Sequence, residues 1–401
     1  MDIPKKFNNR KLLPLTPKLA ILASSFVMSL LIIEIGIRIY QKAADIRLFN
    51  LPPQRTTLRF YDNKIFGSAL IPNHEGWFVP HTKEYFTWVE VNSDGWPDIE
   101  HPVKKPENTF RIVILGDSFV ENTQVALENR FFRKLEKMLN EKLDKTIEII
   151  AVGRGNTGTA QQYLILKNEI NKYEPDLVIH MFLTANDIKN NSQKLQGDPY
   201  LPYYELDGGE LKLIPHKLRN QRKAARVKEA LKKARIVELL LQARQKYFEY
   251  KKHIKFDGFP LEYHVYEKDW SPDYQNAWEL TKALIRVSRH ETNKMGADYI
   301  LVTLSNNEQV HKSVWEELKN TYPEMKNKEF DLEKPDKKII DFCEKENLTC
   351  WQMLDTFKNY VKENPNKNTH NRLEGHWNQL GSDLAAKFLF ENLLENYFTI
   401  K

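Results

Sequence analysis

The sequence predicts an α/β fold, a three-layer α/β/α sandwich around a parallel sheet, preceded by an N-terminal transmembrane helix. Three observations support this prediction. From residue 110 onward, short and almost continuously apolar segments alternate with amphipathic ones, the pattern of parallel strands covered by helices on both faces. Turn-forming Gly, Pro and Asp residues separate several of these segments. Residues 19–40 form a predominantly apolar run of the length that spans a bilayer.

Five segments are predicted strands because they are short, apolar and rich in β-branched residues. They cover residues 111–115, 147–152, 177–183, 299–303 and 349–352. Amphipathic periodicity predicts helices over residues 131–143, 160–173, 277–295, 336–345 and 382–397. A further strand-like segment, 85–91, lies in a stretch rich in Pro and aromatic residues, which we interpret as a connector that packs on the main domain.

The apolar segment Leu19–Tyr40 is interpreted as a permanent membrane anchor. The alternative is a cleaved signal peptide, but no small-x-small cleavage site follows the apolar core. Glu34 and Arg38 are four residues apart, so they can pair on one helix face near the membrane surface. Five Lys and Arg residues precede the segment, and three lie at or beyond its end. The positive-inside rule therefore predicts a cytoplasmic N-terminus and a main domain in the periplasm or at the cell surface.

We expect three parts: a tail and anchor (1–44), a connector (45–106) and a main domain (107–401) with a helical insertion at about 200–275. Residues 217–255 contain fourteen Lys and Arg but three Glu, a local +11 in a chain of net charge +6. Because the basicity belongs to one segment, it does not imply nucleic acid binding. The predicted helix over 218–252 is either a solvated helix or a contact for anionic headgroups or an acidic polymer.

The chain has two cysteines, Cys343 and Cys350, at the predicted end of a helix and start of a strand. An exported domain permits a disulfide between them, and two buried free thiols are the alternative. Neither cysteine has a companion at metal-ligand spacing, so we expect no metal site.

The segment Arg111–Phe119 ends a predicted strand with Gly-Asp-Ser. This layout puts the Ser118 hydroxyl just past the carboxyl end of a parallel strand, where open α/β sheets bind ligands. A serine nucleophile also needs a base and donors aimed at the oxyanion that it creates.

Three later segments can supply those groups. Gly153–Thr159 is a glycine-rich turn that opens a helix, and its N–H groups can approach a ligand closely; a phosphate loop would end in Gly-Lys-Ser/Thr, which is absent. Asn186-Asp187 follows the third strand, where the Asn186 amide is either an oxyanion donor or a turn cap. His376 lies in a loop before the last helix, from which it can take the serine proton.

In this order, the segments resemble the motifs of the SGNH (GDSL-type) hydrolases, whose fold is flavodoxin-like. Gly116-Asp117-Ser118-Phe119 is similar to the first block of that family, which implies Ser118 as the nucleophile. Gly153 or, as we favour, Gly155 corresponds to the second block, Asn186-Asp187 to the third and His376 to the fifth. The resemblance implies an oxyanion hole made by the N–H groups of Ser118 and Gly155 and the Asn186 amide, with Asp117, Gly153 and Asp187 as alternative site residues.

The acid of the expected triad departs from the common pattern of the family. Many members place an aspartate three residues before the histidine, where this chain has Leu373. Envelope-associated members use Asp-x-His-Trp-Asn instead, and Glu374-Gly375-His376-Trp377-Asn378 is similar to that form with Glu for Asp. We therefore expect Glu374 to orient His376. Asn92–Trp96 also resembles a segment of membrane-anchored members.

The resemblance implies a serine esterase that needs no cofactor and acts on an acetyl or other acyl ester of an envelope carbohydrate or lipid. Transfer of the acyl group to a sugar hydroxyl, with a membrane protein as partner, is one alternative. A catalytically inactive scaffold or glycan-binding subunit of a membrane assembly is the other, because the position of Leu373 lacks the common aspartate.

Overall fold

The computed structural model describes residues 15–45, 56, 58–80, 82–218 and 258–399, and between the last two ranges positions 234, 236, 237, 240, 243, 244, 247 and 248. The chain divides into two units, which are described separately. The first comprises residues 1–51 and 226–246, and the second residues 52–225 and 247–401. The predicted basic helix over 218–252 lies, apart from its first residue and the eight scattered positions, outside the described residues.

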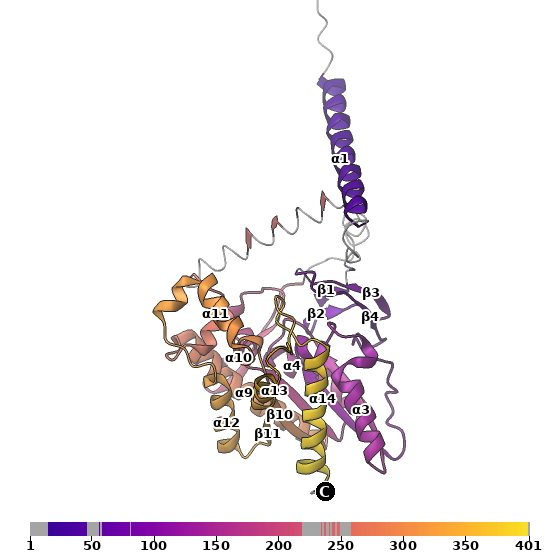
Figure 1. Cartoon of the computed structure of the whole chain (residues 1–401). Helices are drawn as coiled ribbons and strands as arrows, with labels where there is room; N and C mark the ends of the chain where they lie inside the picture. Colours follow the sequence, from indigo (N-terminus) through magenta and orange to yellow (C-terminus); the bar gives the residue numbers. More distant parts are fainter. Residues whose placement is uncertain are drawn as a thin grey trace, which may run out of the picture. The chain divides into compact units, whose positions relative to one another are not determined.

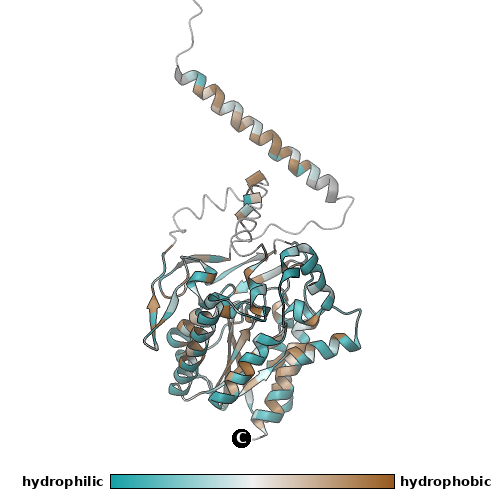
Figure 2. Cartoon of the chain, turned by 90° about the vertical axis from the view of Figure 1, so that its left-hand side faces the viewer, coloured by the Kyte–Doolittle hydropathy of each residue, from teal (hydrophilic) through white to brown (hydrophobic). Residues whose placement is uncertain are grey.

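Helix α1 (Leu15–Asp45) belongs to the first unit. Its segment Pro17–Tyr40 has 24 residues, a mean hydropathy of 2.2 and no buried part, and apolar residues dominate its length (Figure 2). By length and composition this helix can cross a membrane, a test that anchors and signal sequences both meet. The predicted pair forms, with Arg38 Nε 2.8 Å from Glu34 Oε1.

The second unit is built on a five-stranded sheet in the order β11-β10-β7-β5-β6, with every neighbouring pair parallel. The strands are β5 (Thr109–Gly116), β6 (Thr146–Gly153), β7 (Leu177–Leu183), β10 (Asp298–Leu304) and β11 (Cys350–Gln352), close to the predicted bounds. Since β5 lies between β6 and β7, the strand order reverses there. Ligand sites of open α/β sheets lie at such a switch point.

Helices cover both faces of the sheet, so the predicted three-layer sandwich is confirmed (Figure 1). Alternate residues of β5 point to opposite faces. Ile112 and Ile114 join the core formed with α3 (Phe131–Lys142) and α14 (Gln379–Leu393). Val113 and Leu115 join the core formed with the helices α4 (Thr159–Ile165), α9 (Pro272–Lys294) and α12 (Lys334–Glu346).

One predicted helix is divided. Instead of a single helix over 160–173, α4 continues as a π-helical turn, Leu166–Ile170, and a 3-10 turn, Asn171–Tyr173. The other helices are α2 (Ser118–Glu121), α5 (Asp187–Asn191), α6 (Gln193–Gln196), α10 (Asn307–Val310), α11 (Lys312–Thr321) and α13 (Leu354–Glu363), with a π-turn, Leu394–Phe398, at the end of α14 and 3-10 turns at Leu127–Asn129, Leu261–Tyr266 and Pro323–Asn327.

Three antiparallel hairpins complete the second unit: β1 (Arg59–Asn63) with β2 (Gly67–Leu70), β3 (His74–Phe78) with β4 (Thr87–Val91), and β8 (Tyr203–Asp207) with β9 (Glu210–Ile214). The first two lie in the predicted connector (45–106), of which residues 52–106 belong to the same unit as the sheet. They share a small core of Leu58, Leu70, Val89 and Val91. Of these strands, the sequence predicted β4 alone.

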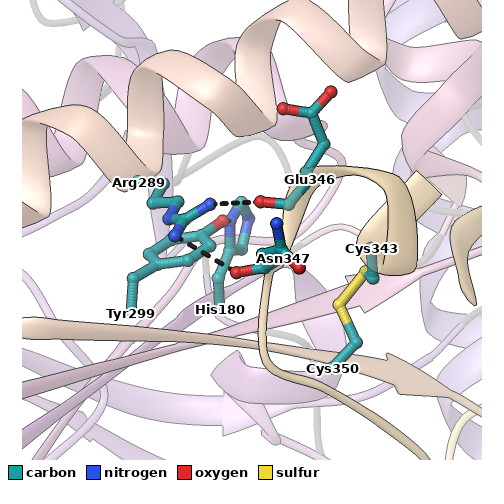
Figure 3. The surroundings of a disulfide bond; sticks show 7 residues. All are labelled: His180, Arg289, Tyr299, Cys343, Glu346, Asn347 and Cys350. Carbon is teal, nitrogen blue, oxygen red and sulfur yellow. Dashed lines mark hydrogen bonds between the residues drawn. A yellow bond between two sulfur atoms is a disulfide. The ribbon is translucent and has the colours of Figure 1, made fainter.

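The two cysteines form a disulfide, so the first of the two sequence-based alternatives is correct. It joins the last turn of α12 to the start of β11, as Figure 3 shows. In the segment between the cysteines, the carbonyls of Glu346 and Asn347 accept hydrogen bonds from Arg289, at 2.8 Å and 3.2 Å. The disulfide fixes the end of α12 to β11, the edge strand of the sheet.

Candidate active site

Ser118 lies at the carboxyl edge of the sheet, immediately after β5. The strand ends at Gly116, and Ser118 is the first residue of α2. Asp117 caps that helix, since its Oδ1 accepts the Phe119 N–H at 2.9 Å. A Cβ at Gly116 would lie 2.5 Å from the Val120 side chain, so glycine here allows Val120 to pack against the end of the strand. The strand, the cap and the glycine together fix the half-buried serine at the rim.

His376 reaches Ser118 from the other end of the chain. Its Nε2 lies 2.6 Å from Ser118 Oγ, although 258 residues separate the two in sequence. The loop that carries it is closed on itself: Asn371 N–H donates to the His376 carbonyl at 2.7 Å, and Asn378 N–H donates to the Thr369 carbonyl at 3.1 Å. The imidazole rests against the Phe119 ring, with 4.8 Å between centroids.

The residue after the histidine anchors this loop in the core. Trp377 is completely buried. Its ring stacks on Phe357 of α13, at 5.5 Å between centroids, and meets Phe131 of α3 edge-on at 6.0 Å. Burial of an aromatic side chain of this size stabilises the loop by about 3 kcal/mol relative to a truncated one. The position of His376 is therefore set by packing.

Glu374 lies beside His376, as the sequence predicted for the third member of the site. Its Oε1 is 2.6 Å from His376 Nδ1, and its Oε2 accepts the His376 backbone N–H at 3.3 Å, so the carboxylate faces the imidazole. Burial alone would lower the pKa of His376; the Glu374 carboxylate, with Asp117 and Glu121 farther away, raises it above its ordinary value.

Leu373 points away from this centre. Its side chain is 65% exposed, and its N–H donates to Glu84 Oε1 at 2.9 Å, while the other Glu84 oxygen accepts the Glu374 N–H at 2.8 Å. Glu84, from the connector, thus holds the backbone of the histidine loop. Position 373, where many members of the resembled family have an aspartate, is therefore on the surface. The next residue, Glu374, lies beside the histidine.

The two candidate glycines lie in different surroundings. A Cβ at Gly153 would overlap the backbone of Val120 and Glu121, so this glycine allows α2 to pack on the end of β6. Gly155 is the nearer to the nucleophile, since its Cβ position would lie 3.5 Å from Ser118 Cβ. Its N–H donates to the Glu121 carboxylate. In this structure the predicted oxyanion donor therefore already has an acceptor.

Glu121 is in turn paired with Arg59 of β1. Arg59 Nη2 lies 2.6 and 2.5 Å from the two Glu121 oxygens, and Arg59 Nη1 donates to the Gly155 carbonyl at 3.1 Å. The Glu121 side chain is only 6% exposed. Arg59, Glu121 and Gly155 form a cluster, here called the clasp, beside Ser118. Sequence reasoning missed Arg59, Glu121 and Glu84, because no local pattern marks a contact between residues so far apart.

Asp117 and Asp187 lie in the core of the second unit. Both are fully buried. Burial raises the pKa of Asp117 to about 6, although the Phe119 N–H, His376 and the neighbouring Asn186 amide act in the opposite direction. Burial, together with the charge of Asp117, raises the pKa of Asp187 well above its ordinary value. Asp187 Oδ2 accepts the Leu183 N–H at 3.0 Å, which holds the end of β7 in place.

Asn186 is half-buried and lies close enough to Asp117 to affect its pKa. It precedes α5 but accepts no capping hydrogen bond from it. Within the part of the chain that the structure describes, no group of three His, Cys, Asp or Glu side chains could hold a metal ion.

No protein family and no curated protein matches the sequence of the chain. Solved structures do resemble its fold. An acetyl xylan esterase has 13% identity and a TM-score of 0.38, over 71% of this chain and 100% of that one. A lipase/acylhydrolase from Enterococcus faecalis has 12% identity and a TM-score of 0.35, over 71% and 95%. A GDSL-like lipase from Bacteroides thetaiotaomicron has 9% identity and a TM-score of 0.32, over 71% and 88%.

These similarities concern the fold alone, and nothing about the substrate or activity of the chain follows from them. The fold is a three-layer α/β/α sandwich in which Ser118 and His376 meet at the carboxyl edge of the parallel sheet.

Proposed function

We propose that the chain is a membrane-anchored SGNH-type serine esterase or acyl-transfer enzyme. One observation carries the proposal: the 2.6 Å contact between His376 Nε2 and Ser118 Oγ at the sheet edge. A nucleophile and base within hydrogen-bond reach, the base in contact with an acid, is the arrangement that activates a serine.

In the proposed reaction, His376 removes the hydroxyl proton as Ser118 Oγ attacks an ester carbonyl. Glu374 stabilises the imidazolium that forms, because its carboxylate lies 2.6 Å from Nδ1. His376 then returns the proton to the leaving alcohol, and an acyl-serine remains. Water, or a sugar hydroxyl in the transfer reaction, attacks the acyl-serine through the same base.

The Ser118 N–H and the Asn186 amide are the proposed donors to the oxyanion. The Gly155 N–H can join them only when Glu121 releases it, since it now donates to that carboxylate. Each such donor contributes about 10²-fold to 10³-fold to turnover in serine hydrolases. We therefore propose that the resting site is short of one donor.

An envelope ester is the proposed substrate. The apolar helix α1 supports attachment to a membrane, and the Cys343–Cys350 disulfide supports an oxidising compartment for the second unit. A carbohydrate or lipid ester of the envelope is the substrate class that fits such a location.

A fluorophosphonate probe tests the nucleophile without knowledge of the substrate. We expect mass spectrometry to find the adduct on Ser118 in the full-length chain, and no adduct in Ser118→Ala. Ser93→Ala is a matched control, because the Ser93 hydroxyl lies in the connector and donates to Glu100 Oε2 at 2.7 Å, with no histidine in that hydrogen bond. A wild-type chain that stays unlabelled while correctly folded would rule out an active serine.

One observation favours an inactive scaffold or glycan-binding subunit as a second candidate: the clasp, which engages the Gly155 N–H. Incubation with p-nitrophenyl acetate separates the candidates. An enzyme gives turnover that Ser118→Ala lacks, whereas a scaffold gives the same background rate in both. Addition of an acceptor glycan then separates hydrolysis, which yields free acid, from transfer, which yields acyl-glycan.

A further inference from the structure

A cavity of about 340 Å³ lies between the β1–β2 hairpin and the turn at residues 94–96. Its size falls at the low end for small-ligand sites. Its walls include the aromatic rings of Phe60, Phe66 and Trp96 and the charged groups of Asp94, Arg154 and Glu169. The cavity thus includes Asp94 and Trp96 of the Asn92–Trp96 segment, to which the proposed mechanism gives no role.

Arg154 is the unusual member of this cavity. It is 3% exposed, and its guanidinium lies 4.8 Å from the Phe66 ring centroid and 4.9 Å from that of Trp96. Its Nε and Nη1 are buried without a hydrogen-bond partner, and among the described residues no carboxylate lies within ion-pair distance of the side chain. Burial, with the charge of Arg59, lowers its pKa to about 9, so it remains a cation at neutral pH.

The other two fully buried arginines of the described chain, Arg111 and Arg130, both donate side-chain hydrogen bonds. Arg111 forms an ion pair with Glu148 at 2.7 Å and donates to three backbone carbonyls. Arg130 donates to the carbonyls of Val125 and Pro97. An unpaired buried guanidinium destabilises a fold, and the two ring contacts of Arg154 leave its N–H groups without acceptors. Because Nε and Nη1 are closed off from the cavity, an anion that enters it would pair with the remaining nitrogen, Nη2.

The two carboxylates of the cavity are acceptors that already have a cation. Asp94 accepts from Lys172 Nζ and from the Tyr173 hydroxyl, both at 2.5 Å, and Glu169 lies 3.5 Å from Lys172. Both carboxylates are partly exposed and can accept further hydrogen bonds from hydroxyl groups. An aliphatic chain, or a compact anion without hydroxyls, would leave these acceptors unmatched. A sugar ring matches them.

We propose that this cavity binds a sugar ring that carries an acidic group, as a hexuronate does. The carboxylate of the sugar pairs with Arg154, its hydroxyls donate to Asp94 and Glu169, and its apolar ring face lies against Phe60. Charge-assisted hydrogen bonds from Nη2 select for a carboxylate. Arg154 directly precedes Gly155, whose Cβ position would lie 3.5 Å from Ser118 Cβ, so the cavity wall and the candidate site are neighbours in sequence.

Sugar binding to the cavity can be measured without any esterase activity. Only the idea that the cavity is a substrate subsite rests on the proposed function. Full-length Ser118→Ala chain in detergent micelles is titrated by calorimetry with glucuronate and, separately, with glucose. We expect glucuronate to bind at least about tenfold more tightly, the size of a charge-assisted pair. Arg154→Met should remove this preference, and Arg286→Met should keep it, because Arg286 of α9, which lies over Phe342 and pairs with Glu346, does not line the cavity.

Thermal unfolding provides the second measurement. If Arg154 is retained to bind a ligand, Arg154→Met should unfold at the same or a higher temperature, since no hydrogen bond is lost. Equal affinity for glucuronate and glucose, or no binding of either, would overturn the proposal. So would an Arg154→Met chain that binds normally but unfolds at a lower temperature, because Arg154 would then be structural. Glucuronate binding by a wild-type chain that shows no esterase activity would leave this site intact and refute only the proposed reaction.

Discussion

His376 is the residue whose role is most directly open to test. Its Nε2 lies 2.6 Å from Ser118 Oγ, and a general base contributes at least about 10²-fold to turnover. We therefore expect His376→Ala to lose at least about 10²-fold in kcat for p-nitrophenyl acetate. His290→Ala, which removes an exposed histidine from α9, is the matched control and should keep full activity. A His376→Ala enzyme of normal activity would remove this residue from the mechanism.

Glu374 sets the pH range in which His376 can act. The base must be neutral, and the Glu374 carboxylate raises the pKa of His376 above its ordinary value of 6.5. The kcat/KM of the wild type should therefore fall as the pH drops through a value above 6.5. Glu374→Gln removes the charge but keeps the size of the side chain, so the fall should move to lower pH, and the activity at high pH should decrease.

The pH–rate profiles of the two enzymes measure this shift. Glu84→Gln is the control, because Glu84 holds the backbone of the same loop without touching the imidazole. An acid limb at the same pH in wild type and Glu374→Gln would show that Glu374 does not act on the base.

The elements around the site explain what the sequence could and could not predict. The strands β5, β6, β7 and β10 are almost continuously buried, so their apolar runs are visible in the sequence. Strands of the hairpins are four or five residues long and partly exposed, and short mixed segments have no distinctive periodicity. The division of the helix after Ile165 into π and 3-10 turns leaves the amphipathic pattern unchanged, so it too escaped prediction.

The residues of the candidate site also fall into two groups, those that the sequence could predict and those that it could not. Ser118, Asn186 and His376 could be found from the sequence because each follows a strand or precedes a helix, in an order that a family resemblance links. Arg59 and Glu121 could not, because their contact spans 62 residues and joins two elements without a shared motif. Long-range ion pairs between single residues leave no trace in a single sequence.

The clasp links the β1–β2 hairpin to α2, and mutation of its two charged residues tests whether it masks the Gly155 N–H. Arg59→Met together with Glu121→Leu removes both charges, so that no unpaired charge stays buried, and frees the Gly155 N–H. We expect turnover of p-nitrophenyl acetate to rise, by up to about 10²-fold if the free N–H becomes an oxyanion donor.

The single variant Arg59→Met is the control for this pair. It leaves the Glu121 carboxylate on Gly155 and without its cation, so it should unfold at a lower temperature and gain no activity. A double variant that folds normally but has lower activity than the wild type would assign Glu121 a positive role in the reaction instead of a masking one.

The N-terminal helix is the feature of the whole chain from which we predict its location. Pro17–Tyr40 is apolar enough to be an anchor or a signal sequence, but the sequence has no small-x-small site after its apolar core, so signal peptidase has no preferred place to cut. We therefore expect a tag placed before residue 1 to remain on the protein and to stay in the membrane pellet after a carbonate wash.

Protease added to spheroplasts tests the orientation of the same tagged protein. Because more Lys and Arg residues precede the apolar segment than follow it, the positive-inside rule predicts that the tag is protected and the second unit is digested. Exchange of the basic residues before the segment for Gln should reduce this bias and make part of the tag accessible. A tag that is lost on export, with the remaining chain in the soluble fraction, would identify the helix as a signal peptide and the mature enzyme as a soluble protein outside the cytoplasm.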